Sequence, residues 1–67
     1  MKIDKYQRSE IFCGEPGETL IVQYDNRGDP YVEGITFELN DGDKCVFVFI
    51  EKQEAKRIAS LIEKLYP

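Results

Sequence analysis

Carboxylates are the side chains with the greatest chemical potential in this chain, and they are concentrated in one part of it. Nine Asp and Glu residues lie between Glu10 and Asp43, and Arg27 is the only base among them, so this segment carries nine negative charges and one positive charge. The whole chain of 67 residues has a net charge of -4. A concentrated negative field attracts cationic partners and repels nucleic acids. The charge pattern therefore predicts an acidic surface that binds a basic protein, either directly or by imitating nucleic acid.

The expected partner-binding residues come from loops and strands in the later part of the acidic segment. They are Asp25, Asp29, Glu33, Glu38, Asp41 and Asp43. The alternative is that these acids are ordinary solvated charges that keep a small domain in solution. The near absence of Lys and Arg favours a working surface, because mixed charges would serve solubility equally well.

Enzymatic and metal chemistry lack their usual residues. Histidine is absent, which removes the commonest general base and the commonest metal ligand. Cys13 and Cys45 have no Cys-x-x-Cys spacing and are predicted to be free, buried thiols. The residues that follow Asp25 or Asp41 do not fit a calcium loop, which needs glycine sixth and glutamate twelfth. We therefore predict a protein that is not an enzyme and that uses no metal and no cofactor.

Length and composition predict one small domain that spans residues 1–67. A chain with 42% hydrophobic and 33% charged residues is typical of a folded globular protein. So short a chain has a small core, which a second subunit would extend. The longest apolar run, residues 45–50, cannot span a membrane, and the first residues lack the apolar core of a signal peptide. We expect a cytoplasmic protein.

Four strand-like stretches precede one helix. Apolar patterning predicts strands at roughly 3–13, 19–24, 31–39 and 45–50, separated by turns rich in Gly, Pro, Asp and Asn. From Lys52 onward, apolar residues recur at steps of three and four, which predicts an amphipathic helix. Its apolar stripe is Ala55, Ile58, Ala59, Ile62 and Leu65. The expected fold is α+β, a four-stranded antiparallel β-meander with one C-terminal amphipathic α-helix packed on one face (ββββα).

The Asp41-Gly42 pair predicts a tight hairpin between the third and fourth strands, with positive φ at both residues. Such a turn places Leu39 opposite Lys44, and opposed residues share a face of the sheet. One face then presents six apolar residues to the helix: Ile35, Phe37, Leu39, Val46, Val48 and Ile50. This face is the predicted core.

The opposite face of the sheet keeps apolar residues that one helix cannot cover. The set is Ile21, Val32, Phe47 and Phe49. We expect this second face to form the interface of a two-fold homodimer. The alternative is that the N-terminal segment covers it, with Tyr6, Ile11 or Phe12 as the lid. Gly34 is expected to relieve crowding beneath Phe49.

The end of the chain supports a second functional hypothesis. A strand that ends Val48-Phe49-Ile50-Glu51, then a helix that contains Gln53-Glu54-Ala55, after three antiparallel strands, resembles the order of elements in PC4-like single-stranded-DNA-binding domains. The resemblance covers this order and roughly the last third of the chain. It implies a dimer that binds a single nucleic-acid strand.

Bases at the two ends of the chain would then contact phosphates: Lys2, Lys5, Arg8, Lys52, Lys56 and Arg57. Tyr24, Tyr31 and Arg27 remain for stacking and phosphate contacts. The chain departs from that family where function would lie, because the loops and strands that should be basic are acidic. The leading function is therefore a protein-interaction module or inhibitor, and the PC4-like nucleic-acid-binding dimer is the alternative. A small-ligand carrier with a dimer cleft comes third.

Overall fold

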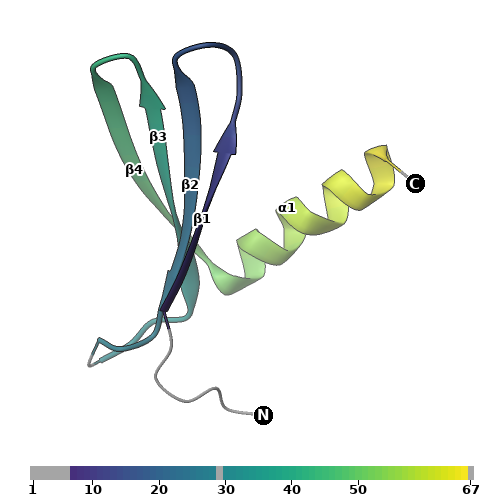
Figure 1. Ribbon diagram of the computed structural model, residues 1–67. Coiled ribbons are helices and arrows are strands. Elements are labelled where there is room, and N and C mark those ends of the chain that lie inside the picture. The colour runs from purple at the N-terminus through teal and green to yellow at the C-terminus, as the bar shows by residue number, and fades with distance from the viewer. Residues whose placement is uncertain (1–6, 29, 67) are drawn as a thin grey trace.

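The computed structural model describes residues 7–28 and 30–66, which form an antiparallel sheet followed by one helix (Figure 1). The strands are β1 (Gln7–Cys13), β2 (Glu18–Asp25), β3 (Gly34–Asp41) and β4 (Lys44–Glu51), and the helix is α1 (Lys52–Leu65). The strands lie in the order β1-β2-β3-β4, and each adjacent pair is antiparallel. The predicted ββββα meander is confirmed.

The largest difference between the predicted and observed strands lies before β3. Apolar alternation predicts a strand from Tyr31, whereas β3 begins at Gly34. The carbonyl oxygen of Glu33 accepts a hydrogen bond of 3.1 Å from the backbone N–H of Lys52. The backbone just before β3 therefore holds the start of α1 instead of extending the ladder with β2. Residues 3–6 of the first predicted strand lie outside the described residues.

The β3–β4 hairpin is tight, but its register differs from the predicted one by two residues. Asp41 pairs with Lys44, where the prediction placed Leu39, so the two turn residues are Gly42 and Asp43. Gly42 has a φ of 63°, and Asp43 has no positive φ. A type II′ turn needs positive φ only at its first central residue, which explains glycine there. The predicted register is wrong, but a shift of two residues leaves every side chain on its predicted face.

The β1–β2 connection is a turn with proline and glycine at its centre. The N–H of Glu18 donates to the carbonyl of Glu15 at 2.8 Å, and Gly17 has a φ of 89°. Proline followed by a positive-φ glycine is the pattern of a type II turn. The N–H of Gly42 donates to the carbonyl of Gly17 at 3.0 Å, which joins this turn to the β3–β4 turn. We call residues 14–18 and 41–44 the hairpin end; the β2–β3 loop and the start of α1 lie at the opposite end of the sheet (Figure 1).

The register divides the sheet into two unlike faces. One, the apolar face, has charged residues at its margins, Arg8 and Glu10 on β1 and Glu18, Asp41 and Lys44 at the hairpin end, and its other residues are Phe12, Leu20, Val22, Tyr24, Ile35, Phe37, Leu39, Val46, Val48 and Ile50. The other, the mixed face, alternates polar and apolar side chains: Ser9, Ile11, Cys13, Thr19, Ile21, Gln23, Thr36, Glu38, Asn40, Cys45, Phe47 and Phe49. Neither face is covered by another layer of the same chain.

Helix α1 contacts β3 and β4. Ala55 is half-buried, and every other residue of α1 is exposed. Figure 1 shows the helix extending away from the end of the sheet. The predicted apolar stripe is present but covers little of the sheet, so no hydrophobic residue in the described ranges is buried. No helix in those ranges is long and apolar enough to cross a membrane.

Candidate functional site

The hairpin end gathers four carboxylates from two separate turns. Glu15 and Glu18 come from the first hairpin, Asp41 and Asp43 from the second, and Lys44 is the base among residues 14–18 and 41–44. Glu18 directly opposes Asp41 in the β2–β3 ladder. Like charges directly opposite one another destabilise a sheet. The fold therefore holds two acids together, and Lys44, which opposes Asp41 in the β3–β4 ladder, offsets only one of the two negative charges.

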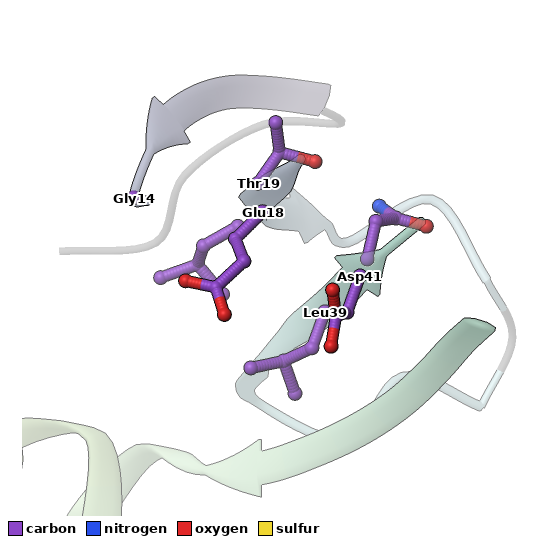
Figure 2. A pocket seen from close by; sticks show the side chains of 7 residues that line it. Gly14, Glu18, Thr19, Leu39 and Asp41 are labelled. Atoms are coloured by element: carbon purple, nitrogen blue, oxygen red, sulfur yellow. The ribbon is translucent and has the colours of Figure 1, made fainter. Parts of the chain in front are cut away.

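A hollow lies beside these acids. It has a volume of about 320 Å³ and is lined by Gly14, Glu18, Thr19, Leu20, Leu39, Asn40 and Asp41. Figure 2 shows the carboxylates of Glu18 and Asp41 near the side chain of Leu39. Glu18 Oε1 accepts a hydrogen bond of 3.2 Å from the N–H of Glu15, which orients this carboxylate. The hollow thus combines an apolar lining with two negative groups.

This combination suits one kind of ligand. Lys and Arg side chains bury an aliphatic stem along apolar surface while their charged head stays among polar groups. A stem against Leu20 and Leu39 would bring the head toward Glu18 and Asp41. Charge-assisted hydrogen bonds from guanidinium or ammonium to carboxylate are the stronger class of hydrogen bond. The arrangement can bind a basic side chain without any covalent chemistry.

The structure does not bring the six predicted partner-binding acids into one patch. Asp41 and Asp43 lie at the hairpin end. Asp25 and Glu33 lie at the opposite end of the sheet, and Glu38 lies in the middle of β3 on the mixed face. Asp29 lies outside the described residues. The six acids are thus distributed over both ends and one face.

The acids away from the hairpin end already have partners in the chain. Glu33 Oε2 lies 3.0 Å from Lys52 Nζ. Glu38 is half-buried, and its carboxylate accepts hydrogen bonds from Gln23 Nε2 at 3.4 Å and from Asn40 Nδ2 at 2.9 Å. A cationic partner would have to compete for these carboxylates. They are weaker candidates than the acids of the hairpin end.

Among the carboxyls of the described residues, Asp25 has the most strongly shifted pKa. Arg27 donates to it through Nε and Nη2, each at 2.9 Å, and through its backbone N–H at 3.0 Å. These hydrogen bonds, the side-chain ones first, lower the pKa of Asp25 from 3.8 to about 2, and the same pairing raises the pKa of Arg27. These bonds are local, so they order the start of the β2–β3 loop.

Sequence reasoning missed Glu15 and Glu18 as site residues, although a signal for them existed. In a meander, the first and third turns lie at the same end of the sheet. The Gly14-Glu15-Pro16-Gly17 turn and the Asp41-Gly42 turn were both recognisable in the sequence. Combining them places Glu15 and Glu18 beside Asp41 and Asp43 and leaves Asp25 at the far end.

The groups that the nucleic-acid hypothesis needs are largely engaged within the chain. Each of four bases is ion-paired: Arg8 with Glu10 at 2.8 Å, Arg27 with Asp25 at 2.9 Å, Lys52 with Glu33 at 3.0 Å and Arg57 with Glu54 at 2.6 Å. Lys56 is exposed on α1, and Lys2 and Lys5 lie outside the described residues. A phosphate would have to displace a carboxylate from each paired base.

The two tyrosines proposed for stacking contact each other. The rings of Tyr24 and Tyr31 meet edge to face, with their centroids 6.1 Å apart. The Tyr31 hydroxyl oxygen is buried. Its pKa is raised, first by burial and then by the neighbouring Tyr24 hydroxyl. This pair stabilises the end of the sheet near the β2–β3 loop, and its geometry is not that of an open stacking platform.

The remaining predicted residues are placed as follows. Ile21, Phe47 and Phe49 share the mixed face, whereas Val32 precedes β3 and is 60% exposed. Cys13 and Cys45 are free, as predicted, but both are exposed in a single chain, so the prediction that they are buried is wrong. The reason is that the mixed face, where both lie, has no covering layer. Among residues 7–28 and 30–66, no three Cys, Asp or Glu side chains are grouped to hold a metal ion.

Comparison with known proteins adds no homologue to this description. No family model matches the chain, and neither the curated proteins nor the solved structures contain a significant match.

Proposed function

We propose that this protein is a non-enzymatic, cytoplasmic interaction module that binds a basic segment of a partner protein through its hairpin end. The observation that carries the proposal is the opposed pair Glu18 and Asp41 beside the apolar hollow lined by Leu20 and Leu39. A pair of like charges that destabilises the sheet is better explained by binding than by solubility, which scattered charges would serve as well.

Charge is distributed along the molecule in a way that suits this role. Residues 14–18 and 41–44 contain four acids and one base, whereas α1 contains four bases and two acids. The field at the hairpin end would therefore steer a basic surface toward that end and away from the helix. In its stronger form, the proposal is that the hairpin end imitates the phosphates that such a surface binds, so that the protein acts as an inhibitor.

The alternative function remains a PC4-like dimer that binds a single nucleic-acid strand, because the observed order of elements is the one that the resemblance implies. This alternative would use the basic residues of α1, Lys52, Lys56 and Arg57. The two functions require opposite ends of the molecule, so they can be separated by substitution.

The test uses two fluorescent probes in about 0.1 M salt, a synthetic peptide rich in Lys and Arg and a single-stranded oligonucleotide. The site variant is Glu18→Gln with Asp41→Asn, which removes two charges and keeps the side-chain shapes. The matched control is Asp25→Asn with Glu33→Gln, which removes the same charge at the opposite end of the sheet. The peptide should bind the natural protein at least about 10-fold more tightly than the site variant, since two charge-assisted bonds are lost.

The control variant should bind the peptide within about threefold of the natural protein, because distant charges are screened over about 10 Å at 0.1 M salt. Equal losses in the two variants would mean that overall charge, and not the hairpin end, binds the peptide. Sub-micromolar affinity for the oligonucleotide, lost on Lys52→Glu with Arg57→Glu, would establish the alternative function instead.

A further inference from the structure

A single copy of this chain exposes more surface than a folded monomer of its size. Its accessible area is 5969 Å² for 7.8 kDa, whereas the scaling for folded monomers gives about 4,400 Å². The excess is about 1,600 Å². If the eight residues outside the described ranges were fully exposed and were left out of both areas, the rest would still exceed its expected area by about 600 Å². This chain therefore needs another surface to cover it.

Part of the excess lies on two apolar surfaces that the fold leaves separate, and Ile11, Phe47 and Phe49 on the mixed face are exposed as well. On the apolar face of the sheet, Phe12 is 50% exposed and Val46 is 55% exposed. On α1, Ile58, Leu61, Ile62 and Leu65 are exposed by 40, 57, 51 and 63%, and their spacing places them on one side of the helix. In a small domain, an apolar sheet face and an apolar helix stripe usually pack against each other as two layers. In a single copy of this chain, the two surfaces are both present but do not cover each other.

The helix cannot cover the sheet of its own chain without breaking contacts at its start. Strand β4 ends at Glu51 and α1 begins at Lys52, so there is no linker between them. The backbone N–H of Lys52 is hydrogen-bonded to the carbonyl of Glu33, and the side chains of the same two residues form an ion pair. These contacts fix the direction in which α1 leaves the sheet. A second copy can supply a helix without disturbing them.

The mixed face is the poorer docking surface for such a helix. Glu38 lies at its centre, where its carboxylate is held by Gln23 and Asn40. Covering it with apolar side chains would remove water from a charged group that is held by two neutral amides, which is costly. On the apolar face the charged side chains lie at the margins: Arg8 and Glu10 pair with each other at 2.8 Å on the edge strand β1, and Glu18, Asp41 and Lys44 lie at the hairpin end.

We propose that two copies form a two-fold dimer in which α1 of each copy lies on the apolar face of the other. The dimensions match, because a 14-residue helix is about 21 Å long and 8-residue strands are about 26 Å long. Removing the excess area from both chains would bury about 1,200 to 3,200 Å² in total, which spans standard to obligate interfaces. This dimer interface is on the apolar face, whereas the sequence suggests one on the mixed face at Phe47 and Phe49.

The test measures dimerisation by light scattering and sedimentation over a range of protein concentrations. The natural chain should be a dimer at micromolar concentration. Leu61→Glu should weaken dimerisation at least about 100-fold, because the two-fold axis places the lost contact in the interface twice. Ser60→Glu, one residue along on the opposite side of α1, is the matched control and should change the dimer constant by no more than about threefold.

A second pair of variants identifies the sheet face. Val48 and Phe47 are neighbours in β4 on the apolar and mixed faces, so Val48→Glu should abolish the dimer and Phe47→Glu should leave it. Mixing Leu61→Glu with Val48→Glu should restore a dimer, since one helix and one sheet remain intact between the two chains. If Val48→Glu does not fold, Leu61→Glu and Ser60→Glu still decide, because Leu61 is more than half exposed in a single copy.

A natural chain that stays monomeric at about 100 μM would overturn the proposal, since an interface of this size gives tighter association. Loss of the dimer on Phe47→Glu but not on Val48→Glu would place the interface on the mixed face. Failure of two folded variants to restore a dimer would show that the helices are not exchanged. Leu20 and Leu39 belong both to the hollow and to the apolar face. The two proposals are tested at different residues, Glu18 and Asp41 for peptide binding and Leu61, Val48 and Phe47 for dimerisation, so either can fail alone.

Discussion

Replacing Gly34 by alanine tests the packing of the most enclosed residue in the sheet. Gly34 is buried, alone among the described residues. A Cβ atom there would lie 2.5 Å from the carbonyl oxygen of Ile50 and 2.9 Å from Cε1 of Phe49. Real Cβ atoms keep at least 3.0 Å from other heavy atoms. The Phe49 ring can move, but the Ile50 carbonyl belongs to the paired backbone of β4, so the two strands must shift.

The expected size of the effect follows from two opposing contributions. Overpacking of this kind costs typically 1–3 kcal/mol, whereas replacing glycine gains about 0.4–1 kcal/mol because the unfolded chain has less freedom to lose. Gly34→Ala should therefore lower the free energy of unfolding by about 1–2 kcal/mol. For a domain of this length, that corresponds to a fall in Tm of roughly 5–15 °C.

Urea and thermal unfolding, followed by circular dichroism at one fixed protein concentration, measure the change; the concentration must be fixed because association alters apparent stability. Gly28→Ala is the matched control, since a Cβ there meets nothing within 4 Å and its φ is not positive. It should be neutral or slightly stabilising. In the Phe49→Ala background, Gly34→Ala should cost less but should still be destabilising, because the Ile50 carbonyl remains. Equal stability of Gly34→Ala and the natural protein would refute the reasoning.

Two further predictions concern titration and thiols. The Asp25 carboxyl should titrate in NMR spectra with a midpoint of about 2, and Arg27→Ala should return this midpoint toward 3.8. Because the pKa of Asp25 is lower in the folded state, the ionised carboxylate stabilises the fold above pH 3.8, and this stabilisation is lost as the pH falls to about 2. A midpoint near 3.8 in the natural protein would show that Arg27 does not hold this carboxylate. Cys13 and Cys45 lie on the two edge strands, three strand spacings or roughly 14 Å apart, beyond disulfide reach. Both should therefore react with a thiol reagent after denaturation without prior reduction, and a chain that reacts only after reduction would contradict the strand order.

The faces of the sheet could be read from the sequence because side chains alternate with a period of two. Phe37 and Val48 were assigned to one face and Phe47 and Phe49 to the other, and the structure agrees. The register could not be read so reliably, since Asp41-Gly42 and Gly42-Asp43 are both acceptable turn centres. The error of two residues exchanged partners along the strands but left the faces intact.

The amphipathic character of the helix was likewise determined by sequence, because it depends only on residue spacing. Its direction was decided by tertiary contacts, the hydrogen bond and ion pair between Lys52 and Glu33. Those contacts lead α1 away from the sheet, so the apolar stripe does not cover the face that its pattern matches. The spacing of apolar residues determines which side of the helix can pack on a sheet, whereas the contacts at its first residue determine the direction in which the helix runs.

The acidic character of residues 10–43 was determined by composition alone, but its distribution in space was not. Antiparallel pairing brought Glu18 opposite Asp41 and joined the two turns through Gly42 and Gly17. The same pairing carried Asp25 to the far end, where Arg27 neutralises it. Charge adds up along a sequence, but a binding surface depends on which charges the strand order makes neighbours.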